Sequence, residues 1–446
     1  MNNILANNIS RRHFLISTGV LGIAANTMLN GTLAANETQS ETQSKLLRFA
    51  VISDTHFENK RGEGAKVKVP KALKNLLFKK PPVDAIFVAG DLTDRGRQEE
   101  YDQLKAVFDN KDFVPEGVNV HYLMGNHDHI DPNGQKYYLA KLQQPLHQFI
   151  DIGGYPFITI SLNSARASGY NESSRQFLAD NLEKSAKDYS GKPVFVFMHV
   201  PPLDTCYGSL KHEGWGTDVL LSILNKYPQA VVFAGHSHFP IGDPRSIHQD
   251  KFTSINVGST TYSEVERGIV NAGIHPEQYK YVTEGIIVNI FVDGNIEIER
   301  WDTYRNEEIL PRWSIKSPHD GSQFSYKNRK GLPAPAFAAG TKPIIDITKN
   351  SCTITFPQAT ENEVVFRYTV DIIDNGNTIL STSKFSQFYL NSKMPDKLSV
   401  QFSDLPVDKK LLARVRAYDS YNNSSEPIEC EIFIVPKPAV QAASVS

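Results

Sequence analysis

Five short groups of metal-coordinating residues recur along this chain, each directly after a stretch with the composition of a β-strand. The groups are Asp54-x-His56, Gly90-Asp91, Gly125-Asn126-His127-Asp128, His199 and Gly235-His236-x-His238. Mixed oxygen and imidazole ligands suit Fe, Mn, Zn or Co and do not distinguish among these metals. The residue types therefore favour a metal-binding site at the ends of these strands.

Each group taken singly also has an ordinary structural explanation. A Gly-Asp pair after a strand serves as a turn or a helix cap, and Asn-His-Asp serves as a turn. A lone histidine such as His199 is often a core residue. Their shared position favours the ligand interpretation, because neighbouring strands of one sheet bring their ends together. Asp91, which follows the apolar run 84–89, is predicted to hold its carboxylate rigidly at such an end.

Strands alternate with helices from residue 46 onward. We expect strands at 46–53, 84–89, 119–124, 157–162, 194–198 and 230–234 and helices at 68–78, 98–108 and 175–187. The stretches 252–257, 285–292 and 295–303 read as closing strands, the last two forming a hairpin through Asp293-Gly294. This alternation predicts an α/β fold with a sheet covered on both faces.

In this order the motifs resemble those of the calcineurin-like metallophosphoesterase superfamily over roughly residues 46–305. The resemblance implies a two-sheet α/β/β/α sandwich with two metal ions. It implies that the first metal is bound by Asp54, His56 and His238. It implies that the second is bound by Asn126, His199 and His236, and that Asp91 bridges the two. His127 would contact the substrate phosphate or protonate the leaving oxygen, with Asp128 beside it as a further catalytic residue.

Arg95 has two open interpretations. The run Asp94-Arg95-Gly96 resembles the phosphate-binding arginine segment of the protein serine/threonine phosphatase branch. That branch has an arginine before Gly-Asn-His and a glutamate after it, where this chain has Met124 and Asp128. Arg95 therefore contacts either the substrate or a surface carboxylate.

The C-terminal part changes to period-two strands without helices. We expect a linker at 313–342, a β-sandwich at 343–436 and a tail at 437–446. The stretches 368–371 and 415–425 resemble a fibronectin type III domain. In an exported chain Cys352 and Cys430 could form a disulfide, but we expect two free, buried thiols. The partner of this domain is left open, and packing or substrate docking are its ordinary roles.

The N-terminal residues 1–35 are interpreted as a signal peptide. Ser10-Arg11-Arg12-His13-Phe14-Leu15 resembles the twin-arginine export motif, and small residues ending at Ala34-Ala35 follow a modestly apolar segment. The alternative is a short amphipathic or disordered N-terminus. Residues 36–45 form a polar linker. We therefore expect export to the periplasm or secretion.

Composition limits the class of protein. A formal net charge of −2 over 446 residues lacks the bulk positive field of a nucleic-acid-binding protein. No apolar run reaches the roughly 20 residues of a membrane span. The insert 128–155 and the loop 203–215, with Tyr207, His212 and Trp215, are expected to decide substrate choice.

The sequence thus predicts an exported dinuclear phosphoric ester hydrolase, with phosphodiester and phosphomonoester substrates both open. The alternative is an exported binding or adhesion protein whose hydrolase domain is inactive. The intact set of seven candidate ligands counts against that alternative.

Overall fold

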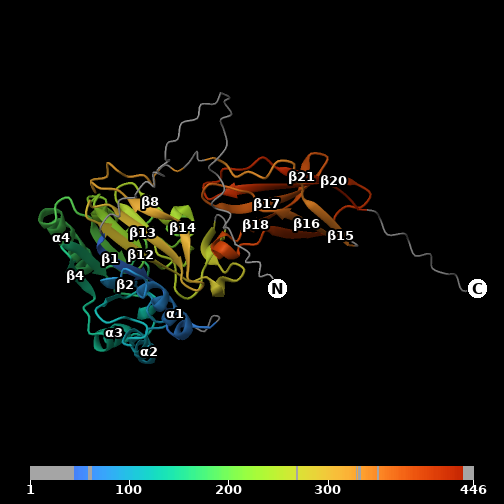
Figure 1. Ribbon diagram of the computed structural model, residues 1–446. Helices are drawn as coiled ribbons and strands as arrows, with labels where there is room; N and C mark the ends of the chain where they lie inside the picture. The colour runs from blue at the N-terminus through green and yellow to red at the C-terminus, as the bar shows by residue number, and fades with distance from the viewer. Residues whose placement is uncertain are drawn as a thin grey trace, which may run out of the picture. The chain divides into compact units, whose positions relative to one another are not determined.

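A computed structural model describes residues 45–58, 63–267, 270–327, 329, 333–348 and 351–434 (Figure 1). The predicted signal peptide at 1–35 lies outside these residues, as does all of the 36–45 linker except Lys45. No helix in the described ranges has the length and apolar character needed to cross a membrane.

The first sheet has the strand order β14-β13-β12-β1-β2-β3. Its strands are β1 Lys45–Ile52, β2 Ala85–Ala89, β3 Asn119–Leu123, β12 Glu284–Phe291, β13 Ile296–Asp302 and β14 Glu307–Ile315. The first three are parallel to one another, and β12 to β14 extend the sheet as an antiparallel meander. The predicted hairpin through Asp293-Gly294 joins β12 and β13.

The second sheet has the order β4-β5-β6-β7-β9-β8. Its strands are β4 His147–Ile152, β5 Tyr155–Ile160, β6 Val194–Met198, β7 Ala230–Ala234, β8 Ile247–Gln249 and β9 Thr253–Asn256. Strands β5, β6, β7 and β9 are parallel, and β4 and β8 are antiparallel edges. Strands β5, β6, β7 and β9 are buried along their whole length, as expected for parallel strands covered on both faces.

Phenylalanine side chains fill the space between the two sheets. Phe87 on β2 stacks on Phe197 on β6, with ring centroids 3.9 Å apart, and Phe49 on β1 meets Phe195 edge-on at 5.1 Å. The outer faces are covered by α1 Ala65–Leu77, α2 Gln98–Phe108 and α3 Gly134–Leu142 on one sheet and by α4 Glu172–Asp188 and α5 Leu221–Leu224 on the other. The layers are helix, sheet, sheet and helix, which confirms the predicted fold class.

Two expectations about loops are wrong. The insert 128–155 is not a loop, because it contains the short helix η2 His127–His129, then α3 and β4. Buried Tyr138 fixes α3 by donating its hydroxyl to the Tyr122 carbonyl, a contact with no local sequence signal. The linker does not begin at residue 313, because β14 continues to Ile315 and both Trp313 and Ile315 pack between the sheets.

The C-terminal part is an all-β sandwich, as predicted. One sheet has the order β15-β16-β19 and the other β18-β17-β20-β21. The strands are β15 Ile344–Thr348, β16 Ser351–Pro357, β17 Val365–Asp374, β18 Asn377–Phe385, β19 Lys397–Ser403, β20 Lys410–Asp419 and β21 Ile428–Phe433. All three cysteines are free: Cys206 and Cys352 are buried, but Cys430 is partly exposed, contrary to expectation.

Lys45–Ser446 forms one compact unit, and an apolar cluster joins the sandwich to the α/β part within it. Phe366 on β17 and Phe388 in η5 Phe388–Lys393 pack with Tyr207 and Phe239. Tyr207 and Phe239 lie 4.6 Å apart and border the loops around the predicted ligands His236 and His238. The remaining elements are η3 Pro244–Ser246, the β10 Val265–Arg267 and β11 Val270–Ile274 pair, and η4 Tyr279–Tyr281.

Glu284 on β12 predicts a pH dependence of stability. Burial raises its pKa from 4.5 to about 8, while one of its oxygens accepts the Ile241 N–H at 2.9 Å. A carboxyl whose pKa is raised by folding contributes full stability below its unfolded pKa, and loses it as the pH rises through its folded pKa.

Glu284→Gln removes this titration and keeps an oxygen for Ile241. Between about pH 5 and pH 8, the wild type should lose on the order of a few kcal/mol of unfolding free energy relative to the variant. Denaturant unfolding at both pH values measures the difference. Glu99→Gln at an exposed position is the control, and parallel pH curves for wild type and Glu284→Gln would contradict the prediction.

Candidate metal centre

The predicted ligands gather where five parallel strands of the two sheets end. Asp54 and His56 follow β1, and Asp91 follows β2. Asn126 follows β3, His199 follows β6, and His236 and His238 follow β7. The site is thus shared between both sheets.

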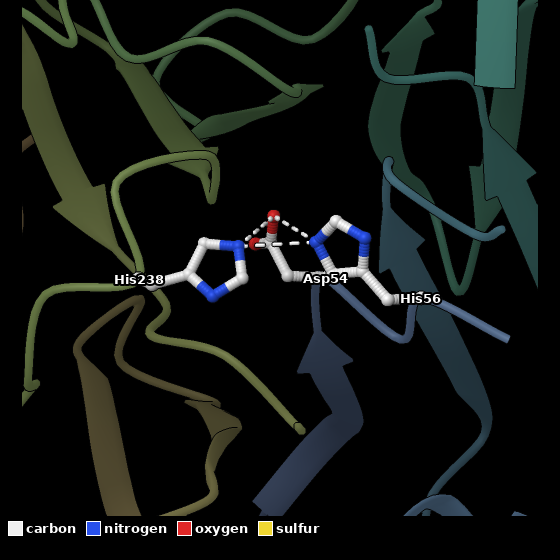
Figure 2. Close-up of side chains that lie close together, drawn as sticks. All are labelled: Asp54, His56 and His238. Carbon is white, nitrogen blue, oxygen red and sulfur yellow. Dashed lines mark hydrogen bonds and ion pairs between the residues drawn. The ribbon is translucent and has the colours of Figure 1, made fainter. Parts of the chain in front are cut away.

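Asp54, His56 and His238 form the first group (Figure 2). The carboxylate oxygen Oδ1 of Asp54 lies 3.2 Å from Nε2 of His238 and 3.8 Å from Nε2 of His56. The two Nε2 atoms are 3.1 Å apart. Asp54 Oδ1 is buried without a hydrogen bond, which is costly unless a cation completes the group.

Asp91, His199 and His236 form the second group. Nε2 of His199 lies 3.2 Å from Oδ2 of Asp91 and 3.1 Å from Oδ1 of Asn126. The same Asp91 oxygen is 3.7 Å from Nε2 of His56 in the first group. Asp91 therefore connects the second group to the first and would be the ligand shared by two bound ions. The donor set and its spacing fit two metal ions.

In two of the histidines, a backbone carbonyl determines which ring nitrogen faces the site. Nδ1 of His199 donates to the Ala89 carbonyl at 2.9 Å, and Nδ1 of His238 donates to the Tyr262 carbonyl at 3.1 Å. Because a carbonyl only accepts, Nδ1 carries the hydrogen in the neutral ring and Nε2 carries the lone pair. This second contact is typical of metal-binding histidines.

Electrostatics keep Asp54 and His236 in their coordinating forms but favour the protonated form of His199. Burial alone would raise the pKa of Asp54, but His238 and His199 lower it to about 2. Burial and the neighbouring His199 lower the pKa of His236 to about 3. Burial disfavours protonation of His199, but Asp91 raises its pKa to about 9. A cation that binds His199 would displace that proton.

The ligand loops store backbone strain. Asp54, His56, Asp91, His236 and His238 all have positive φ angles, at 57°, 39°, 46°, 70° and 57°. Each such residue costs roughly 1–2 kcal/mol, and strain of this kind is found where the surrounding contacts over-determine the backbone. Gly125, next to Asn126, has no room for a side chain, because a Cβ there would lie 2.2 Å from Oδ1 of Asp91.

Asp128 supplies many of those contacts and does not lie beside the His127 ring as a catalytic partner. Its carboxylate is fully buried and accepts the N–H groups of Leu92, Thr93 and Gly125 at 2.9–3.1 Å. It also accepts the hydroxyls of Thr93 and Tyr101 at 2.6 and 3.2 Å. Asp128 thus ties the loop after β2 to the loop after β3. The sequence did not reveal this role, since Thr93 and Tyr101 carry no recognisable signal.

His127 lies at the edge of the first group. Its ring contacts the ring of His56 edge-on at 4.6 Å, and its Nδ1 donates to the Asp94 carbonyl at 2.8 Å. Its backbone N–H donates to Oδ1 of Asp91 at 2.9 Å. The carboxylate near it belongs to Asp94, which shares a potential ligand group with His56 and His127. His127 is therefore placed to approach a bound ester.

Arg95 is exposed in the loop before α2. Its backbone N–H donates to the Glu100 carboxylate at 2.9 Å, and its carbonyl accepts the Asp131 N–H at 2.7 Å. These contacts fix the loop and leave the guanidinium role as a prediction.

Residues of the loop 203–215 lie in two different places. Trp215 meets the predicted ligand His236 edge-on at 5.2 Å. Tyr207 and His212 instead line a cavity of about 930 Å³, together with Arg245, Arg329 and Phe366. None of the predicted metal ligands lines that cavity. The sequence did not reveal Tyr262, whose ring is tilted by 36° against the His238 ring with 4.2 Å between centroids. Its position after β9 is the available sequence signal.

Known proteins are similar to part of this chain. The model of the calcineurin-like phosphoesterase family matches residues 47–240. The chain is 30% identical over 198 residues to a probable glycerophosphodiester phosphodiesterase from Arcobacter nitrofigilis, covering 42% of this chain and 70% of that protein. It is 24% identical over 208 residues to a 3′,5′-cyclic-nucleotide phosphodiesterase from Nostoc, covering 43% and 71%.

Among solved structures, a purple acid phosphatase from yellow lupin seeds aligns with a TM-score of 0.46 and 15% identity, covering 61% of this chain and 54% of that chain. A fibronectin type III domain from a human protein aligns with a TM-score of 0.17 and 18% identity over 27% of this chain and 99% of that domain.

The Asp128 contacts predict a loss of metal affinity when its charge is removed. Asp128→Asn should bind Mn²⁺ or Zn²⁺ about 10–100-fold more weakly, because residues that orient ligands typically have effects of this size. Calorimetric titration of metal-stripped protein measures the affinity. Asp131→Asn, at a polar position of the same loop, is the matched control. Equal affinity in Asp128→Asn and wild type would contradict the assigned role.

Proposed function

Because the chain belongs to the calcineurin-like phosphoesterase family, we propose that this metal-dependent phosphoesterase is an exported phosphodiesterase. The observation that best supports metal-dependent hydrolysis is the position of Asp91, whose Oδ2 lies 3.2 Å from Nε2 of His199 and 3.7 Å from Nε2 of His56. The relatives named above act on glycerophosphodiesters and cyclic nucleotides, which favours the diester over the monoester.

The proposed ligand assignment follows from the two groups. Asp54, His56 and His238 would hold one metal ion, and Asn126, His199 and His236 the other, with Asp91 between them. When bound, two such ions neutralise phosphate oxygens and lower the pKa of the attacking water. Mixed oxygen and nitrogen ligands are consistent with Fe, Mn, Zn or Co.

His127 is the residue proposed to deliver a proton to the leaving oxygen. The Asp94 carbonyl holds its Nδ1–H, so Nε2 is the nitrogen that exchanges a proton with the ester. The backbone N–H of His127 is fixed on Asp91, so the ring keeps a defined position relative to both groups.

His127→Ala should separate proton delivery from metal binding. A positioned general acid contributes about 10²–10⁴-fold, and the loss is greatest when the leaving alkoxide is a poor leaving group. The variant should therefore lose at least about 100-fold in kcat/KM on an alkyl diester and much less on bis(p-nitrophenyl) phosphate.

His199→Ala should abolish turnover of both substrates, and His212→Ala, on the cavity side of the loop 203–215, should leave both unchanged. Equal losses for both leaving groups in His127→Ala would contradict the acid role. Metal bound by the wild type without turnover of either the mono- or the bis-nitrophenyl ester would favour the alternative, an exported binding protein.

Export is the second part of the proposal and rests on Arg11-Arg12 and the segment that follows. Replacing both arginines by lysine should leave the full-length precursor in the cytoplasm of a host with the twin-arginine pathway. Cell fractionation and the mass of the mature protein measure this. His13→Gln beside the pair is the control, and undiminished export of the double variant would count against the pathway.

A further inference from the structure

A line of aromatic rings runs outward from the first metal group. The centroid of the Tyr262 ring lies 4.2 Å from that of His238 and 5.9 Å from that of His56, with the rings tilted by 36° and 37°. The His275 ring lies 5.5 Å from Tyr262 and stacks on Tyr279 at 4.2 Å with an interplanar angle of 19°. Tyr262 is 5% exposed, whereas the His275 side chain is 37% exposed. The ring line therefore begins at a metal ligand and ends at the surface.

Local contacts hold these rings in place. The Tyr262 carbonyl receives the Nδ1–H of His238 at 3.1 Å, and the Tyr279 carbonyl receives the Ser263 N–H at 3.1 Å. His275 directly follows β11 and pairs with Glu264, with 3.4 Å between Nε2 and the carboxylate. The line thus has a fixed position relative to the metal group.

The C-terminal sandwich anchors the same segment from the other side. Glu277 lies between His275 and Tyr279, and its carboxylate contacts Nζ of Lys384 at 3.3 Å and the amide of Gln387. Ile274 and Val282, which flank the segment, pack in the cluster that contains Phe388 and Tyr389. A surface fixed from two sides loses little entropy when a ligand binds.

We propose that Tyr262, His275 and Tyr279 form the subsite for the organic group of the ester, and that this group carries a planar ring such as a nucleobase. The inference rests on the proposed function, because it places the phosphate at the two metal groups. A substituent of that phosphate then extends past His238 and His56 along Tyr262. Every base has a π face that stacks on aromatic side chains, whereas a glycerol group gains little there.

The position of His127 agrees with this subsite. His127 and Tyr262 both lie against the His56 ring, at 4.6 and 5.9 Å between centroids. An ester bound at the first group therefore has a proton donor and the ring line within reach of the same phosphate. The sandwich, by fixing Glu277, acquires a part in substrate choice.

Two phosphate monoesters that share a phosphate and differ in the organic group test the proposal. Adenosine 5′-monophosphate and glycerol 3-phosphate are titrated calorimetrically into the Mn²⁺-loaded full chain. The double variant His275→Ala/Tyr279→Ala should bind the nucleotide about tenfold more weakly, as expected for the loss of one stacking contact. Its affinity for glycerol 3-phosphate should be unchanged.

Single variants and a control separate stacking from folding. Tyr279→Phe should keep the nucleotide affinity and Tyr279→Leu should lose it, because both retain an apolar side chain and only the first retains a π face. Tyr281→Ala is the matched control, since Tyr281 is 42% exposed, lies two residues further on and contacts Tyr304 instead.

Unchanged nucleotide affinity in the double variant, or an equal loss for both monoesters, would overturn the subsite. Failure of the proposed function gives a different result. A wild type that hydrolyses no ester but binds the nucleotide tenfold more tightly than the double variant supports the subsite and rejects the phosphodiesterase.

Discussion

The carboxylate of Asp91 is the contact on which the candidate site depends. One oxygen lies between His199 and His56, and the other accepts the His127 N–H at 2.9 Å. A single buried anion thereby connects the two imidazole groups and the proposed acid. Such an anion is unfavourable in a protein interior unless charges or hydrogen bonds compensate it. The His127 N–H and the imidazoles of His199 and His56 supply part of that compensation, and bound cations would complete it.

Holding that carboxylate requires strained loops, and Asp128 stabilises them. The residues with positive φ angles at the site lie after β1, β2 and β7, where the chain turns sharply out of a buried strand. Asp128 accepts five hydrogen bonds and joins the loops after β2 and β3. A charged acceptor of several backbone N–H groups is among the stronger hydrogen-bonded arrangements in proteins. The expected role beside His127 is thus replaced by a positioning role.

The rings between the sheets determine how far apart the two halves of the site lie. Phe49, Phe87, Phe195 and Phe197 interdigitate between β1, β2 and β6, so the loops that follow these strands have a fixed spacing. Asp54 and Asp91 come from one sheet and His199 and His236 from the other. A change of packing in this core therefore also changes distances at the site. The sandwich adds a further constraint on the loops around Phe239 and Glu277.

The sequence by itself determined the strands and the ligand types, because buried parallel strands are continuous apolar runs and their ends carry Asp, Asn and His. It placed α2 at 98–108 without error. Tertiary structure decided what local patterns do not encode: the helix α3 held by Tyr138, the end of β14 at Ile315, and the direction of the Asp128 carboxylate. It also decided which rings meet the ligands, since Tyr262 contacts His238 and Trp215 contacts His236 through folding of distant segments. The sequence reveals the periodicity of each strand and helix, whereas contacts between segments that are distant in the sequence depend on how those segments pack.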